Sequence, residues 1–162
     1  MDRGQKGLIM NNVIHSNKLF TAVYEQLGAD SIEEFVQICG DIYRNGASAG
    51  FSGFIYYQET RDFAHKNQKI IEEALVECAN EMGMSPSELI KTCNWIKDYL
   101  TEFTTQEFES IFWRIFYAQP FGDDDSDYFN LETRVLNQIS WWALEHVAFR
   151  ITCEAEYQAE NN

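Results

Sequence analysis

Residues 31–46 read SIEEFVQICGDIYRNG, and this stretch alone describes one amphipathic helix. Ser31 and Glu34 form a capping box, in which each side chain accepts a hydrogen bond from the other residue's backbone N–H group. Gly46 provides a stop, because glycine adopts the backbone conformations of a helix C-terminus without strain. Apolar side chains recur between these signals at the spacing of one helix face, which predicts that one side is buried. The residues expected on that side are Ile32, Phe35, Val36, Cys39, Ile42 and Tyr43.

Helical spacing continues on both sides of this stretch. Upstream, a helix is expected between a cap at Ser16 and a stop at Gly28. Downstream, polar cap residues precede four further apolar patterns of helical period. These predict helices from Thr60 to about Met82 with an irregularity near Asn67, from Ser85 to about Leu100, from Thr104 to before Pro120, and from about Asn130 into the 150s.

A glycine-rich segment, GASAGFSGF at residues 46–54, interrupts the helical pattern. Glycine in a helix interior costs backbone entropy, so the segment predicts a loop where chain segments pass closely. The only strand candidate, residues 54–57, is too short to build a sheet. The sequence therefore predicts an all-α fold, a single compact domain of six or seven helices with a glycine-rich loop near residues 46–54.

The length of 162 residues, with 45% hydrophobic side chains, suits one core. We expect a flexible N-terminus at residues 1–14, a single helical domain at 15–158 and a short tail at 159–162. No stretch approaches the ~20 apolar residues of a membrane span, and no signal-peptide core is present, so a cytoplasmic protein is expected. The cysteines lack metal-ligand spacing and are expected to be buried thiols: Cys39, Cys78, Cys93 and Cys153.

Negative charge is concentrated in the second part of the chain. Residues 1–70 carry 8 acidic and 7 basic side chains, whereas residues 71–162 carry 18 acidic and 5 basic ones. A field of this sign repels nucleic acid and membrane phosphates and attracts basic protein surfaces. Direct binding to nucleic acid or to a membrane is therefore not expected.

Some of these acidic residues recur at helical spacing. Glu73, Glu77 and Glu81 are four residues apart, so on a helix they form one stripe with ~6 Å between successive carboxylates along the axis. Asp98 and Glu102 repeat the spacing. Like charges so placed destabilise a helix by a few tenths of a kcal/mol per pair, so the stripe is not explained by helix stability. Two interpretations stay open, a mimic of nucleic-acid phosphates and an ordinary solvated face.

Motifs that suggest catalysis lack the context that they need. Residues 46–50, GASAG, match the G-x-S-x-G nucleophile elbow, and His146 follows downstream. The elbow requires a buried strand before the serine, but a helix is expected there. The three histidines lack metal-ligand spacing, and no phosphate-binding glycine loop with a lysine occurs. No enzyme, cofactor or metal is expected.

The acidic run at residues 123–127, DDDSD, resembles the start of a calcium loop. An EF-hand needs glycine at position 6 and glutamate at position 12, and these positions hold Tyr128 and Arg134. A solvated acidic turn is expected here instead.

Two blocks of sequence resemble a known family. One is Asn45-Gly46-Ala47 with the following GFSGFIYYQET at residues 50–60, and the other is ISWWALEHVA at residues 139–148. Together they resemble a family of small uncharacterised proteins, a domain of unknown function, from bacteriophages and mobile elements of gut bacteria. The second block departs from the family's usual form by carrying His146 where a glutamate is common. The resemblance implies a phage or plasmid accessory protein and implies no catalytic residues.

The charge and this setting together favour a non-enzymatic inhibitor of a host defence protein, of the anti-CRISPR or anti-restriction type. Its expected partner is the basic surface of a host nuclease or CRISPR effector in the host cytoplasm. The alternative is a structural or assembly module of a phage, in which the charge serves only solubility and the aromatic block docks a partner. The residues assigned to partner binding are Glu73, Glu77, Glu81, Asp98, Glu102, Asp123, Asp124, Asp125, Asp127, Tyr56 and Tyr57.

Overall fold

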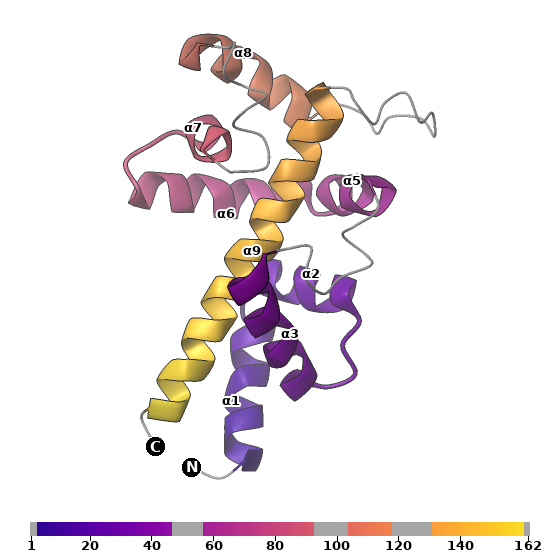
Figure 1. Cartoon of the computed structure of the whole chain (residues 1–162), viewed down its shortest axis with the longest axis vertical. Coiled ribbons are helices and arrows are strands. Elements are labelled where there is room, and N and C mark those ends of the chain that lie inside the picture. The colour runs from indigo at the N-terminus through magenta and orange to yellow at the C-terminus, as the bar shows by residue number, and fades with distance from the viewer. Residues whose placement is uncertain (1–2, 47–56, 93–103, 118–130, 161–162) are drawn as a thin grey trace. The chain divides into compact units, whose positions relative to one another are not determined.

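The computed structural model describes residues 3–46, 57–92, 104–117 and 131–160, and every regular element in these ranges is an α-helix (Figure 1). The prediction of an all-α fold is therefore confirmed. The described helices are α1 (Arg3–His15), α2 (Lys18–Leu27), α3 (Ile32–Asn45), α5 (Tyr57–Lys66), α6 (Gln68–Glu81), α7 (Pro86–Lys91), α8 (Thr105–Phe116) and α9 (Leu131–Glu160).

The chain groups into two compact units. The terminal unit comprises Met1–Ile55 and Leu144–Asn162, and the central unit comprises Tyr56–Ala143. Helix α9 contributes its first part to the central unit and its second part to the terminal unit, because the boundary falls inside it.

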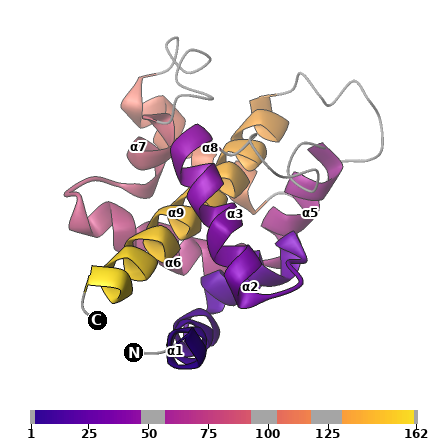
Figure 2. The same ribbon diagram turned by 60° about the horizontal axis from the view of Figure 1, so that its bottom comes forward.

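The terminal unit packs α1, α2 and α3 with the second part of α9. The start of α1 lies beside the end of α9, and α3 crosses α9 (Figures 1 and 2). The Thr21 hydroxyl in α2 donates to the carbonyl of Ile14 in α1 at 2.9 Å, which ties these two helices together. Side chains from all four helices fill the core, including Ile14, Val23, Phe35, Ile42, Val147 and Ile151.

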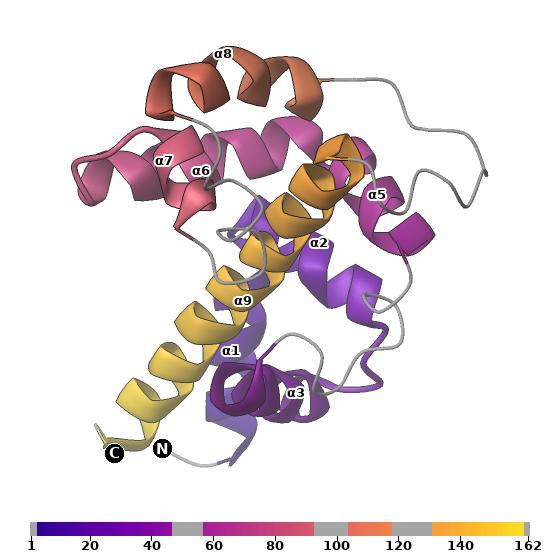
Figure 3. The ribbon, with the colours of Figure 1, turned by 45° about the horizontal axis from the view of Figure 1, so that its top comes forward.

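The central unit packs α5 to α8 with the first part of α9. Helix α7 contacts both α6 and α8, and α8 lies along α6 (Figure 3). The Gln68 side chain at the start of α6 donates to the carbonyl of Phe116 at the end of α8. Buried Ser87 of α7 donates to the carboxylate of Glu109 in α8. Core side chains of this unit include Phe63, Ile71, Leu75, Ile90, Phe108, Phe112, Val135 and Ile139.

Most of the predicted helix signals are confirmed. The backbone N–H groups of Glu34, Glu88 and Glu107 donate to the side-chain oxygens of Ser31, Ser85 and Thr104, at 3.1, 3.3 and 3.1 Å. Gly28 and Gly46 end their helices with φ of 62° and 90°, a region that favours glycine. These signals act within one helical turn, which is why the sequence reveals them.

The N-terminal segment differs from its prediction. Residues 1–14 are expected to be flexible, but α1 begins at Arg3. Burial of Met10 and Ile14 accounts for this helix, and the amide of Gln158 in α9 donates to the Met10 sulfur at 3.7 Å. At the other end, α9 continues to Glu160, into the residues predicted to be a tail.

Three predicted helix boundaries are wrong. Helix α2 is capped by Asn17 and not Ser16, because Asn17 Oδ1 accepts hydrogen bonds from the N–H groups of Leu19 and Phe20 at 2.9 and 3.0 Å. The helix expected from Thr60 starts at Tyr57 and breaks at Asn67, where the irregularity was predicted. Helix α7 ends at Lys91, not near residue 100.

Two side chains expected to be buried are exposed. Tyr43 is 50% exposed although it belongs to the apolar pattern of α3. Cys153 is exposed, whereas Cys39 is buried as predicted and Cys78 is half-buried. Burial raises the pKa of the Cys39 thiol to about 12, which makes this thiol unreactive at neutral pH. Cys93 and most of the glycine-rich segment lie outside the described residues.

Candidate functional site

The predicted stripe of three glutamates lies on the exposed side of α6. Glu73, Glu77 and Glu81 are all exposed, whereas Ile71 and Leu75 are fully buried. Successive helical residues are ~100° apart, so the glutamates lie on the side of α6 opposite the core. The three carboxylates therefore face solvent in a single row, which we call the α6 stripe.

The α6 stripe contains no internal charge compensation. Four residues before Glu73 lies the exposed Lys69. A lysine N-terminal to a glutamate is the less favourable order for an ion pair on a helix. Within the described ranges, no ion pair reaches any of the three glutamates. Each adjacent pair of carboxylates therefore repels, at a cost of about 0.2–0.5 kcal/mol.

The position of the stripe along α6 adds a second unfavourable term. Glu81 is the last residue of the helix, and no basic residue lies in that last turn. The C-terminus of a helix carries a partial negative charge, so a carboxylate there is destabilising by a few tenths of a kcal/mol. Local helix energetics thus oppose this arrangement of charges.

The central unit, to which the stripe belongs, carries most of the acidic residues of the chain. Residues 56–143 carry 16 acidic and 7 basic side chains, whereas the terminal unit carries 10 and 5. The net charges are −9 and −5. A surface of this charge attracts a basic protein groove and accelerates its association at low ionic strength.

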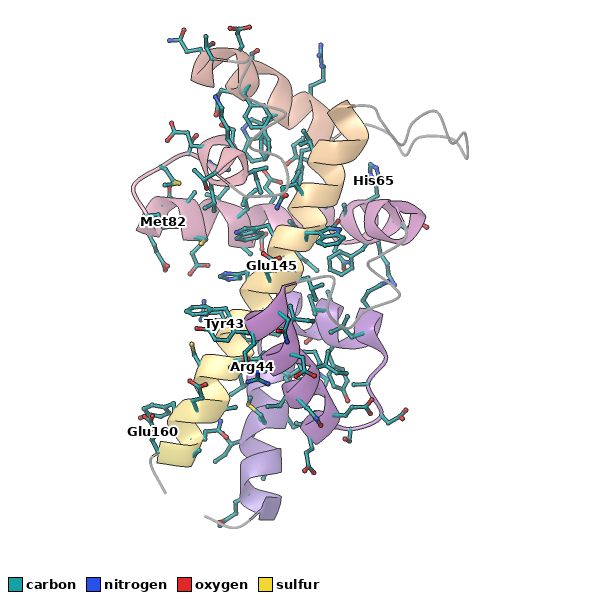
Figure 4. The ribbon with its side chains drawn as sticks, viewed as in Figure 1. Tyr43, Arg44, His65, Met82, Glu145 and Glu160 are labelled. Carbon is teal, nitrogen blue, oxygen red and sulfur yellow. The ribbon has the colours of Figure 1, made fainter. Side chains whose placement is uncertain are left out.

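The end of the stripe is followed by an exposed apolar side chain. Met82 is 56% exposed directly after α6, and Figure 4 shows it projecting from that end of the helix. Gly83 then turns the chain with φ of 72°. The methionine side chain is flexible and apolar, so Met82 places an adaptable apolar group at the end of the stripe.

Glu72 has a different role from its neighbour in the stripe. Its carboxylate accepts a hydrogen bond from the Tyr117 hydroxyl at the end of α8. Desolvation, together with this hydrogen bond and the charge of Glu72, raises the pKa of Tyr117 to about 12. The Tyr117 ring stacks on Trp113, with ring centroids 6.1 Å apart. This contact fixes α8 against α6 beside the stripe, and the sequence pattern did not reveal it because the partners are 45 residues apart.

The structure does not describe the side chains of the other predicted partner-binding residues. Tyr57 begins α5, but its side chain is not among those that the structure describes. The remaining residues also lie outside the described ranges: Tyr56, Asp98, Glu102, Asp123, Asp124, Asp125 and Asp127.

The G-x-S-x-G motif at residues 46–50 is preceded by a helix, as the sequence predicts, and not by the strand of a nucleophile elbow. Helix α3 runs to Asn45 and is capped by Gly46, so the strand that an elbow serine needs is missing from the described residues before it. Burial, with a smaller contribution from the charge of Arg150, lowers the pKa of His146 to about 4. His146 is therefore neutral at physiological pH.

No group of three or more histidine, cysteine, aspartate or glutamate side chains among the described residues is placed to hold a metal ion. None of the described helices is long and apolar enough to cross a membrane.

The model of the family described as "Domain of unknown function (DUF7222)" matches residues 9–157. The chain therefore belongs to this family. No curated protein and no solved structure matches the chain.

Proposed function

We propose that this member of the DUF7222 family is a non-enzymatic accessory protein of a phage or mobile element of gut bacteria. It binds and inhibits a nucleic-acid-handling defence protein of its host, of the CRISPR-effector or restriction class, in the host cytoplasm. The observation that carries the proposal is the α6 stripe, because three exposed and uncompensated carboxylates stand in a row at a cost to helix stability.

The spacing of the stripe suits the groove of a nucleic-acid-binding protein. Phosphates of one DNA strand recur every ~3.4 Å along the axis, so carboxylates ~6 Å apart stand close to every second phosphate. Lysine and arginine side chains that contact phosphates can contact carboxylates in the same way. The rigid helix presents the charges in a fixed row, so binding does not require the row to be ordered first.

A binding role suits the described chemistry better than an enzymatic one. A catalytic site needs a nucleophile or metal beside a positioned base. Among the described residues, no group of three or more histidine, cysteine, aspartate or glutamate side chains is placed to hold a metal ion, and His146, within the 139–148 sequence block, is neutral and half-buried. The carboxylates of the stripe point to solvent, where they can contact a partner.

Charge reversal within the stripe tests the proposal. The protein is used as bait in host lysate to identify a basic nucleic-acid-binding protein, and the purified partner is then assayed for nuclease inhibition. We expect Glu77→Lys to weaken binding at least tenfold, because it places a positive charge in the centre of the row. The control is Glu25→Lys on α2 of the terminal unit, which is also exposed and changes the net charge equally.

The salt dependence gives an independent criterion. The affinity for the partner is expected to fall steeply as ionic strength rises from ~0.01 to ~0.15 M, because screening shortens the range of the charges. An affinity that is flat over this range excludes the phosphate mimic. Loss of function on changing Tyr56 and Tyr57, with none on reversing the stripe, would instead favour the phage assembly module.

A further inference from the structure

A second surface in the terminal unit combines exposed aromatic rings with carboxylates. Phe149, Cys153, Glu156, Tyr157 and Glu160 are exposed, and they follow the i, i+4, i+7, i+8, i+11 spacing of one helix face. The side of α9 that packs into the terminal unit holds Val147, Ile151 and Gln158, which are buried. We call the exposed side the α9 outer face.

Helix α3 adds one more ring to this face. The rings of Tyr43 and Phe149 lie with centroids 5.6 Å apart and an interplanar angle of 45°. Figure 4 shows Tyr43 beside the ribbon of α9. Contact between the rings leaves Tyr43 50% and Phe149 46% exposed, and Tyr157 is 61% exposed. Large aromatic side chains gain much of their free energy from burial, so rings that stay exposed together are typical of a docking surface.

The charges on this face are acidic and are not neutralised from within the helix. Glu156 and Glu160 flank Tyr157 on the exposed side. The nearest basic residue along α9, Arg150, places its guanidinium carbon 5.9 Å from the centroid of the Phe20 ring. In the described part of the chain, no ion pair involves Glu156 or Glu160. Both carboxylates therefore remain open to a cationic group.

We propose that the α9 outer face docks an arginine-containing basic segment of a partner protein. Arginine stacks on aromatic faces through its planar guanidinium and also binds carboxylates through two hydrogen bonds. Tyr43, Phe149 and Tyr157 supply the rings, and Glu156 and Glu160 supply the carboxylates. This surface lies in a different unit from the α6 stripe, and the inference does not depend on the stripe.

The acidic charge of the α9 outer face favours a basic protein segment over a second copy of the chain, nucleic acid or a membrane. In a symmetric dimer of two copies, the same face would meet itself and bring glutamates against glutamates. Nucleic acid and membrane phosphates are repelled by the same carboxylates. A basic protein segment can stack on the aromatic rings and form ion pairs with the carboxylates.

Two peptides of equal charge test the proposal with the full-length protein under reducing conditions. Fluorescently labelled (Arg-Gly)6 and (Lys-Gly)6 are titrated and followed by fluorescence anisotropy. We expect the arginine peptide to bind several-fold tighter, because lysine pairs with carboxylates but stacks less well on rings. Equal affinities for the two peptides would overturn the proposal, since charge alone would then account for binding.

Variants locate the interaction on the molecule. The Phe149→Ala and Tyr157→Ala double variant is expected to lose about tenfold in affinity for (Arg-Gly)6 and to lose the preference for arginine. The matched control is Leu8→Ala, since Leu8 is 62% exposed on α1 and lies ~200° around that helix from the buried Met10. Thermal unfolding checks that all variants are folded.

Two other results would contradict the inference. If Leu8→Ala lowers the affinity as much as the double variant, the α9 outer face is not the docking site. If the wild type is a dimer by analytical ultracentrifugation and the double variant is a monomer, the occupant is a second copy. Neutralising the stripe by Glu73→Gln, Glu77→Gln and Glu81→Gln is expected to keep the arginine preference, which separates this site from the α6 stripe.

Discussion

Replacement of Glu77 by lysine is expected to stabilise the protein, although most surface substitutions are neutral or destabilising. Glu77 has a like charge four residues away on each side, at Glu73 and Glu81. The change removes two repulsions and creates two attractions, each worth about 0.3 kcal/mol. We therefore expect the free energy of unfolding to rise by about 1 kcal/mol, and Tm to rise by about 2–4 °C for a chain of this length.

Urea and thermal unfolding measure this change, and a double-mutant cycle isolates its cause. Reversal of both Glu73 and Glu77 restores a like-charge pair, so the coupling energy between the two reversals is expected to be about 1 kcal/mol. The control cycle reverses Glu73 and Glu81, which lie about 12 Å apart along α6. This distance exceeds the Debye length of ~8 Å at ~0.15 M salt, so the coupling is expected to be near zero.

Two outcomes would refute this reasoning. One is a Glu77→Lys variant that is no more stable than the wild type at ~0.15 M salt. The other is equal coupling in the two cycles, which would show that the stripe glutamates do not interact as neighbours. If the reasoning holds, the same substitution raises stability and lowers partner binding, as expected where a functional surface is maintained against local energetics.

Three further predictions concern the packing and the helix ends. Asn17→Ala is expected to lower the free energy of unfolding by about 1 kcal/mol in urea titrations, because Asn17 caps α2, and a matching loss from Ser16→Ala would contradict this assignment. Gln138→Leu is expected to stabilise by about 1 kcal/mol, since the buried side-chain amide of Gln138 has no hydrogen-bond partner among the residues that the structure describes, and a destabilised variant would reveal a partner elsewhere in the chain. His146 has a folded-state pKa of about 4 against an ordinary value of 6.5, so the unfolded state binds more protons between these values and stability falls as pH is lowered through this window. His146→Gln is expected to remove that part of the pH dependence, and an unchanged difference in unfolding free energy between pH 7 and pH 5 would exclude it.

Features that depend on one helical turn were predictable from the sequence. The caps at Ser31 and Thr104 and the stop at Gly28 involve contacts within four residues along the chain. The α6 stripe belongs to the same class, because the spacing of its glutamates puts them on one side of any helix. Their exposure followed from the apolar residues that occupy the opposite side.

Features that depend on distant partners were not predictable. Helix α1 lacks a clear apolar face in sequence. Its buried Met10 accepts a hydrogen bond at sulfur from Gln158 of α9, which lies 148 residues further along the chain. The Tyr117 and Glu72 contact joins α8 to α6 across 45 residues. Nothing in either local pattern identifies such partners.

The sequence by itself determined the helical class, most helix ends and the acidic row on α6, because hydrogen bonding and side-chain periodicity within a helix are local. Tertiary structure decided which apolar positions are covered. Tyr43 lies on the apolar pattern of α3 together with Phe35, Cys39 and Ile42, yet those three are buried and Tyr43 is not. Coverage depends on the helices packed against a position, and around Tyr43 the contact with Phe149 of α9 leaves half of the ring in solvent. The α9 outer face exists for this reason, because a periodic pattern specifies a side of a helix but not what packs against it.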